Sequence, residues 1–152
     1  MPKPIIADTS CFIILNKIRN LDILKQLYGT VIITQEVYQE YNADLPDWVE
    51  IQSVADTHRQ QILELQIDKG EASAIALALE MADSVIILDD NKARKIAESL
   101  GLNVTGTIGI IIKAKHSGII PSIKPFLEKI KETDFRMSAE LENQALKEAE
   151  EQ

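Results

Sequence analysis

Cysteine and long apolar runs are nearly absent from this sequence of 152 residues. The lone Cys11 excludes an internal disulfide. The longest apolar runs have five or six residues, as at 11–15 and 74–79, far short of the roughly 20 that a membrane helix needs. The first residues lack the pattern of a signal peptide, because Asp8 interrupts the first apolar stretch. We therefore expect a cytoplasmic protein without a membrane segment.

Proline and glycine are also scarce, with five and six residues respectively. No linker rich in these residues and no internal repeat divides the chain into parts. Hydrophobic residues make up 45% and charged residues 26%, which excludes the disordered and fibrous classes. We expect one domain over residues 1–152, ending in a helix and an acidic tail at about 138–152.

A basic excess is missing too, since the formal net charge is −8. Half of this charge lies in residues 140–152, which hold five acids and one lysine. Basic residues cluster along the body at 92–95, 113–115 and 124–131. Each cluster is either a solvated helix face or a contact for a polyanion. The overall acidity therefore does not exclude a nucleic-acid partner.

Short runs rich in β-branched residues predict buried strands at 4–7, 30–33, 84–88 and 103–105. These runs are almost wholly apolar rather than alternating, as in a parallel sheet that is covered on both faces. Strands alternating with helices indicate the α/β class. We expect a three-layer α/β/α sandwich around a central parallel sheet of about four strands.

Helical patterns occupy most of the remaining sequence. They predict helices at 11–17, 21–28, 35–41, 57–67, 71–82, 91–100, 107–116, 122–132 and 138–150. In the helix at 57–67, the spacing predicts that Ile62, Leu65 and Ile67 face the core. The helix at 71–82 is rich in alanine, whose small side chain permits close approach to a sheet.

Acidic side chains follow two of the predicted strands. Asp8 comes directly after the first strand, and Asp89 and Asp90 come after the third. In parallel α/β sheets, ligands bind beyond the carboxyl ends of the strands, so we expect these side chains at one edge. Helix capping is the alternative role for Asp8, but one cap position cannot use both Asp89 and Asp90.

Glutamates add further carboxylates to this edge. The segment after the second strand carries Glu36 and Glu40 one helical turn apart on the same face. We expect at least one of them to point toward the strand ends. Glu71 opens the alanine-rich helix, where it either joins the site or only stabilises the helix N-terminus, by about 0.3–1 kcal/mol.

Carboxylates gathered in this way repel one another. Two charges about 4 Å apart cost roughly 4 kcal/mol at an effective dielectric constant near 20. Raised pKa values, basic partners or a hard divalent cation would relieve the repulsion. Few basic residues lie near these acids, and His58 and His116 stand alone, so we favour Mg²⁺ or Mn²⁺. Such a metal suits phosphoryl chemistry, whereas the signatures of dinucleotide sites, P-loops and serine hydrolases are missing.

The order and spacing of several motifs resemble the PIN domain, the nuclease fold of VapC-type toxins and RNA-processing enzymes. The motifs are IIADTS at 5–10, Glu40, GEASAIALA at 70–78 and ILDDNKAR at 87–94. A prokaryotic branch of predicted nucleic-acid-binding PIN proteins is similar to the later segments GLNVTGTIG at 101–109 and AKHSGII at 114–120. The resemblance covers nearly the whole chain.

The resemblance implies an endoribonuclease that depends on Mg²⁺ or Mn²⁺. The implied catalytic and metal-binding acids are Asp8, Glu40, Glu71 and Asp90, with Asp89 beside them as a further ligand. Two choices stay open, Asp89 against Asp90 and Glu36 against Glu40. The first arises because Leu88 stands where many toxins have a threonine.

Substrate and partners are also expectations at this point. Ser10 would lend polar support to the substrate, and Lys92 and Arg94 are candidate phosphate contacts. The resemblance implies RNA as the substrate and a small antitoxin as protein partner. Apolar residues of the last two helices suit either the core or a homodimer face, and we expect a homodimer. The alternative function is a module that binds RNA or protein without cutting.

Overall fold

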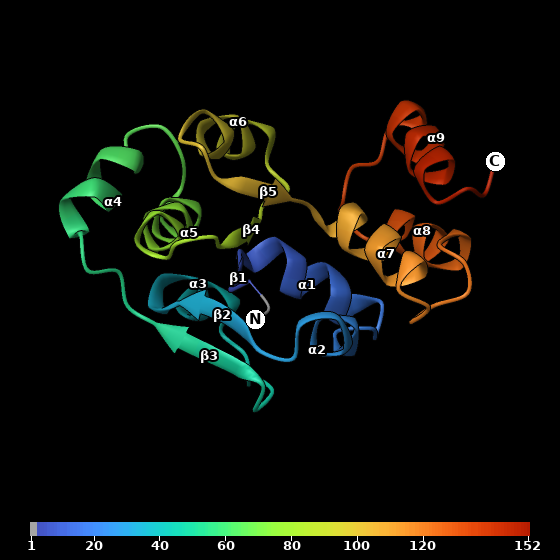
Figure 1. Cartoon of the computed structure of the whole chain (residues 1–152), viewed down its shortest axis with the longest axis horizontal. Coiled ribbons are helices and arrows are strands. Elements are labelled where there is room, and N and C mark those ends of the chain that lie inside the picture. The colour runs from blue at the N-terminus through green and yellow to red at the C-terminus, as the bar shows by residue number, and fades with distance from the viewer. Residues whose placement is uncertain (1–2) are drawn as a thin grey trace.

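A parallel β-sheet between two layers of helices organises the computed structural model, which describes residues 3–152 (Figure 1). The strands are β1 (Ile5–Ala7), β2 (Val31–Thr34), β3 (Val49–Gln52), β4 (Val85–Ile87) and β5 (Asn103–Thr105). Their order is β3-β2-β1-β4-β5, and every neighbouring pair is parallel. The α/β class and the layered parallel architecture expected from the sequence are therefore confirmed.

The sheet has five strands in the described part of the chain, one more than the four expected. The additional strand, β3, pairs with β2 at the edge of the sheet, where Val49 lies opposite Val31. Polar and apolar residues alternate along β3, and Ile51 is 38% exposed. An edge strand covered on one face does not need the continuous apolar run that predicts the other strands.

Successive strand residues point into two separate cores, because side chains alternate between the faces of a sheet. Ile5, Ala7 and Ile87 belong to one core, and Ile6 and Ile86 belong to the other. The first core includes residues of α1 (Thr9–Lys17), α2 (Asp22–Tyr28), α3 (Gln35–Tyr41), α7 (Thr107–His116), α8 (Lys124–Lys131) and α9 (Ala139–Glu148). The second core includes residues of α4 (Thr57–Leu63), α5 (Lys69–Glu80) and α6 (Asn91–Ser99).

The expected helices all form; those at 35–41 and 107–116 have the expected ends, and the ends of the others are shifted. Helix α5 is buried from Gly70 to Ala78, so its small residues do allow the close packing that the alanine pattern predicts. Of the helices in residues 3–152, none combines the length and the apolar character that a membrane crossing requires.

The predicted orientation of the helix at 57–67 is wrong for two of its three residues. Ile62 is 64% exposed and Leu65 is 84% exposed, whereas Leu63 and Ile67 are buried. The helix ends at Leu63, four residues earlier than expected, and a turn follows. Within the helix, Gln60 and Leu63 are the buried residues, so Ile62 points outward. Beyond Leu63, helical spacing no longer describes which residues face inward.

Three helices begin at the carboxyl edge of the central strands. Strand β1 lies between β2 and β4, and the N-cap of a helix comes at or shortly after the end of each of these strands. Asp8 is the N-cap of α1, Thr34 is the N-cap of α3 and Asp90 is the N-cap of α6. The edge therefore presents polar side chains and helix N-termini together.

The C-terminal residues fold back onto α7 and the start of α8 through Glu151. Its carboxylate accepts hydrogen bonds from the Ser122 hydroxyl at 2.5 Å and from the Ile123 amide at 2.8 Å, and lies 3.2 Å from the Lys115 ammonium. Burial raises the pKa of Glu151, but these hydrogen bonds and Lys115 outweigh it and lower the pKa to about 2. These contacts, which we call the Glu151 clasp, anchor the end of α9 against α7.

We expect Glu151→Ala to lower the free energy of unfolding by about 1–3 kcal/mol, because it leaves the Ile123 amide and the Ser122 hydroxyl without their acceptor. Thermal melting at pH 7, with hydrogen exchange of the α9 amides, measures the loss. Since the pKa of Glu151 is lowered from 4.5 to about 2, the difference from wild type should vanish as the pH falls through that interval. Glu98→Ala, on the exposed face of α6, is the control. Equal melting temperatures for wild type and Glu151→Ala would contradict the clasp.

Candidate functional site

Asp8 is a buried acid, and no cation among residues 3–152 compensates its charge. It follows β1 at the centre of the sheet, and the residue is only 4% exposed. Burial raises the pKa of Asp8 to about 8, and the nearby carboxylates of Glu71, Asp68 and Glu40 add to the increase. Its Oδ1 has no hydrogen-bond partner among residues 3–152. A buried polar atom without a partner is costly, so this oxygen indicates a position where a ligand is expected.

Glu71 is the second titrating acid of the site. It lies in the first turn of α5, where its amide bonds to Asp68 Oδ1 at 2.8 Å and its carboxylate accepts from the Asp68 amide at 3.3 Å. This reciprocal capping box holds the side chain at the helix N-terminus. Burial raises the pKa of Glu71 to about 7, with Asp68, Asp90 and Glu40 as further causes.

Glu40, on α3, joins Asp8, Asp68 and Glu71 in a group that we call the acidic cluster. Its Oε2 accepts a hydrogen bond of 2.7 Å from the hydroxyl of Thr9, the residue after Asp8. Its carboxylate also lies against Gly70, where a Cβ atom would stand 2.7 Å from Oε1 and 2.8 Å from Oε2. Glycine at this position therefore makes room for the glutamate.

Glu36 points to a different part of the molecule. Its carboxylate accepts a hydrogen bond of 2.7 Å from the side-chain amide of Gln60 on α4. Only Glu40 of the two contributes to the raised pKa values of Asp8 and Glu71. Of the two candidates on α3, the structure thus brings Glu40 to the acidic cluster and leaves Glu36 beside α4.

A chain of buried hydroxyl groups, the hydroxyl relay, links α3, which carries Glu40, to α5, which carries Glu71. The Val37 amide donates to Thr34 Oγ1 at 3.1 Å, and Thr34 and Ser73 share a hydrogen bond of 2.7 Å. Ser73 donates its own proton to the Gly70 carbonyl at 2.7 Å, so Thr34 is the donor to Ser73. The relay ties the start of α3 to the first turns of α5 and sets the spacing between Glu40 and Glu71.

The neighbouring acids after β4 diverge. Asp90 caps α6 through Oδ2, which accepts from the Ala93 amide at 3.0 Å, and it contributes to the raised pKa of Glu71. Both carboxylate oxygens of Asp89 instead bind Thr107, at 2.8 Å from its amide and 2.6 Å from its hydroxyl. The structure therefore places Asp90 with the acidic cluster and Asp89 with α7.

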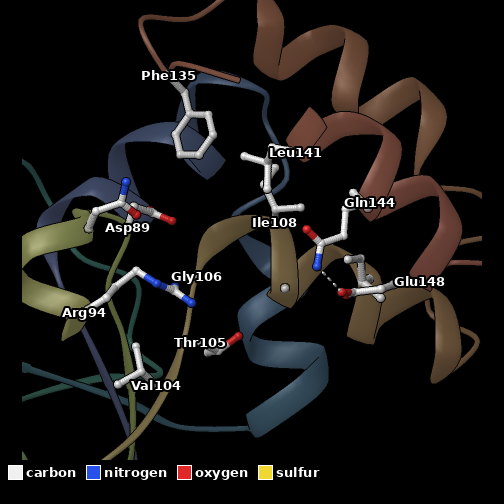
Figure 2. A pocket seen from close by; sticks show the side chains of 14 residues that line it. Asp89, Arg94, Val104, Thr105, Gly106, Ile108, Phe135, Leu141, Gln144 and Glu148 are labelled. Carbon is white, nitrogen blue, oxygen red and sulfur yellow. Dashed lines mark hydrogen bonds between the residues drawn. The ribbon is translucent and has the colours of Figure 1, made fainter. Parts of the chain in front are cut away.

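Asp89 and Arg94 line a cavity of about 450 Å³ between α6, α7 and α9 (Figure 2). Arg94 donates to the Leu88 carbonyl at 2.8 Å. Burial raises the pKa of Asp89, while the Thr107 bonds and Arg94 oppose the increase. The expected phosphate contact Arg94 thus lies in this cavity, whereas Lys92 is exposed on α6.

Ser10 lies at a second cavity of about 290 Å³, next to α1. Asp89 lines this smaller cavity as well. Ser10 therefore shares a cavity with Asp89 and does not enter the hydrogen bonds that hold Glu40 or Glu71.

Asp68 is an acid of the cluster that our sequence interpretation missed. It raises the pKa of both Asp8 and Glu71 while its side chain caps α5. The signal was present, since an aspartate followed three residues later by a glutamate is the pattern of a capping box.

Within residues 3–152, no three acidic, histidine or cysteine side chains form a group that encloses a metal ion as they stand. Repulsion favours separation of carboxylates that lack a cation between them. The donor set is nevertheless one of oxygens alone, and Asp8 Oδ1 is buried without a partner. Such a set matches a hard divalent cation better than a zinc or copper ion.

A comparison with protein families matches residues 4–151 to a family described as a PIN domain. The match spans nearly the whole chain and agrees with the resemblance seen in its motifs. PIN domains are typically nucleases, and they generally use divalent metals. A comparison with curated proteins finds no match.

The raised pKa values predict how the stability of the metal-free protein depends on pH. A carboxyl group whose pKa is higher in the folded state stabilises the fold at low pH and loses that contribution as the pH rises. For Asp8 the interval runs from 3.8 to about 8, and for Glu71 from 4.5 to about 7. In EDTA, we expect Asp8→Asn to melt above wild type at pH 8 and close to it at pH 4. Parallel pH profiles of the two melting temperatures would contradict this assignment.

Proposed function

Because the chain belongs to the PIN-domain family, we propose that it is a metal-dependent endoribonuclease that hydrolyses RNA phosphodiester bonds. The observation that supports this function best is the partnerless carboxylate oxygen of Asp8, with Glu71 and Glu40 near it and Asp90 near Glu71. Once Asp8 loses its proton, its buried charge needs a counter-charge, and the described residues supply none at this point. Mg²⁺ or Mn²⁺ meets that need with the ligand type it prefers.

Each acid of the proposed site is held differently. Asp8 forms the buried floor, and Thr9 orients Glu40 from beside it. The capping box with Asp68 holds Glu71, while the Ala93 amide engages only Oδ2 of Asp90. Glu40 and Asp90 are exposed, so they form the rim that an incoming RNA phosphate meets.

The chain's own residues perform two tasks in the proposed reaction. The acids orient the attacking water, and Lys92, two residues after Asp90, offers an exposed cation to the RNA backbone. When bound, the divalent cation supplies Lewis acidity toward the phosphate and toward water. Since Asp8 and Glu71 bind protons at neutral pH, metal binding competes with protons and strengthens as the pH rises.

We further propose that the protein acts as the toxin of a toxin–antitoxin pair and forms a homodimer. The VapC-like motif order supports the first proposal, and it implies a small antitoxin as partner. The dimer proposal retains support only from exposed apolar side chains, such as Leu141 at 36%. Leu127 and Ile130, two further apolar residues of α8, are instead buried in the core of the chain.

Metal binding is tested by the shift in melting temperature that Mn²⁺ produces. A ligand at about 100 times its dissociation constant stabilises the fold by about 2.7 kcal/mol. We expect Glu40→Gln to weaken Mn²⁺ binding by at least the roughly 10-fold typical of losing one outer partner of a metal ligand. Glu36→Gln, one turn away on the same helix, is the matched control and should bind as wild type does. Equal shifts for all three proteins would contradict the proposed site.

RNA cleavage tests the activity itself. With single-stranded RNA and Mn²⁺, we expect Asp8→Asn and Asp90→Asn to lower the cleavage rate by about 100-fold or more, because each removes an acid that holds the reacting groups. Asp89→Asn should retain more activity, since Asp89 binds Thr107 instead. Cleavage that persists in Asp8→Asn would show a contaminating nuclease. RNA binding without cleavage or a metal shift would favour the non-catalytic module.

A further inference from the structure

Two cavities beside the acidic cluster share a wall made by Phe135 and Asp89. The larger cavity, about 450 Å³, lies between α6, α7 and α9, and the smaller, about 290 Å³, lies next to α1. Phe135 belongs to the segment between α8 and α9 and is partly buried. Figure 2 shows its ring pointing from that segment toward the cavity, above Asp89. One aromatic ring therefore separates two recesses.

The larger cavity combines apolar surfaces with hydrogen-bond donors and acceptors. Ile108 and Leu141 contribute apolar side chains beside the Phe135 ring. Arg94 enters from α6, and Gln144 enters from α9 (Figure 2). A planar ligand with apolar faces and a polar edge matches this arrangement, and nucleobases have that form.

The charges of the larger cavity disfavour a phosphate inside it. Arg94 is accompanied by the carboxylates of Asp89 and Glu148, so the lining holds more acid than base. The guanidinium is already bonded to the Leu88 carbonyl. A neutral base therefore suits the cavity better than an anionic group.

The cavities also lie close to the acidic cluster. Asp89 forms their shared wall, and the next residue, Asp90, belongs to the acidic cluster. Neighbouring Cα atoms are only about 3.8 Å apart. A nucleotide whose phosphate meets Asp90 can therefore extend its base past Asp89 toward Phe135.

We propose that Phe135 is a stacking residue that separates two consecutive unpaired bases of the RNA, one in each cavity. This inference rests on the proposed function and narrows its substrate to single-stranded RNA, because bases in a duplex are not available to enter recesses. Lys17 also lines the smaller cavity. Its ammonium lies 3.6 Å from the exposed carboxylate of Asp134 and offers a positive charge to the RNA backbone.

The test is binding of a labelled single-stranded RNA of mixed sequence, measured by fluorescence anisotropy in EDTA so that no metal-dependent cleavage occurs. Stacking of a base on an aromatic side chain corresponds to roughly a 5- to 150-fold change in affinity. We expect Phe135→Ala and Phe135→Leu to weaken binding by about 10-fold or more, and Phe135→Tyr to bind as wild type does. The matching duplex should bind the wild type more weakly than the single strand.

Phe126→Ala is the matched control, because Phe126 is also partly buried against the same core but contacts Lys129 instead of the cavities. Melting temperatures identify any variant that is unfolded, and Phe135→Leu keeps an apolar side chain against the core. Wild-type affinity in folded Phe135→Leu, or no binding by the wild type, would overturn the stacking role. Absence of cleavage and of a Mn²⁺ shift in the wild type would contradict the proposed function and leave the stacking role standing, whereas wild-type affinity in folded Phe135→Leu with intact metal shifts would contradict the stacking role alone.

Discussion

The carboxyl edge of the sheet depends on the cost of keeping the Asp8 carboxylate out of water. Asp8 is 4% exposed and follows the central strand, so backbone hydrogen bonding to β2 and β4 fixes where it lies. The surrounding acids increase the cost of its charge. Proton uptake or a bound cation neutralises such a charge, and the proton and the cation bind the same carboxylate oxygens.

The scaffold holds this unfavourable arrangement through polar bonds that are themselves buried. Thr34, Ser73 and the Gly70 carbonyl link α3 to α5, and Gly70 leaves space for Glu40. A fully bonded chain of hydroxyl groups costs little to bury, because each donor finds an acceptor. The hydrophobic cores on both faces of the sheet hold these elements in place, so the acids cannot separate by moving their helices apart.

The turn after β4 divides the edge into two regions with different chemistry. The carboxylate of Asp90 acts on Glu71, whereas Asp89 accepts hydrogen bonds from Thr107 and lines the cavities at Phe135. Adjacent residues in an extended segment point in opposite directions, so one dipeptide serves both regions. The acidic cluster and the cavities are thereby placed next to each other without sharing a side chain.

The sequence alone determined the layered α/β class, the placement of nearly all helices and the edge of the sheet where acids gather, because apolar runs and helix caps are local signals. It did not reveal β3, whose alternation reflects its position at the edge, nor that α4 ends before Leu65. Only the tertiary structure decided that Glu40 and Asp90, and not Glu36 and Asp89, join Asp8 and Glu71. Those orientations depend on Gln60 and Thr107, partners 24 and 18 residues away in the chain, which no local pattern specifies.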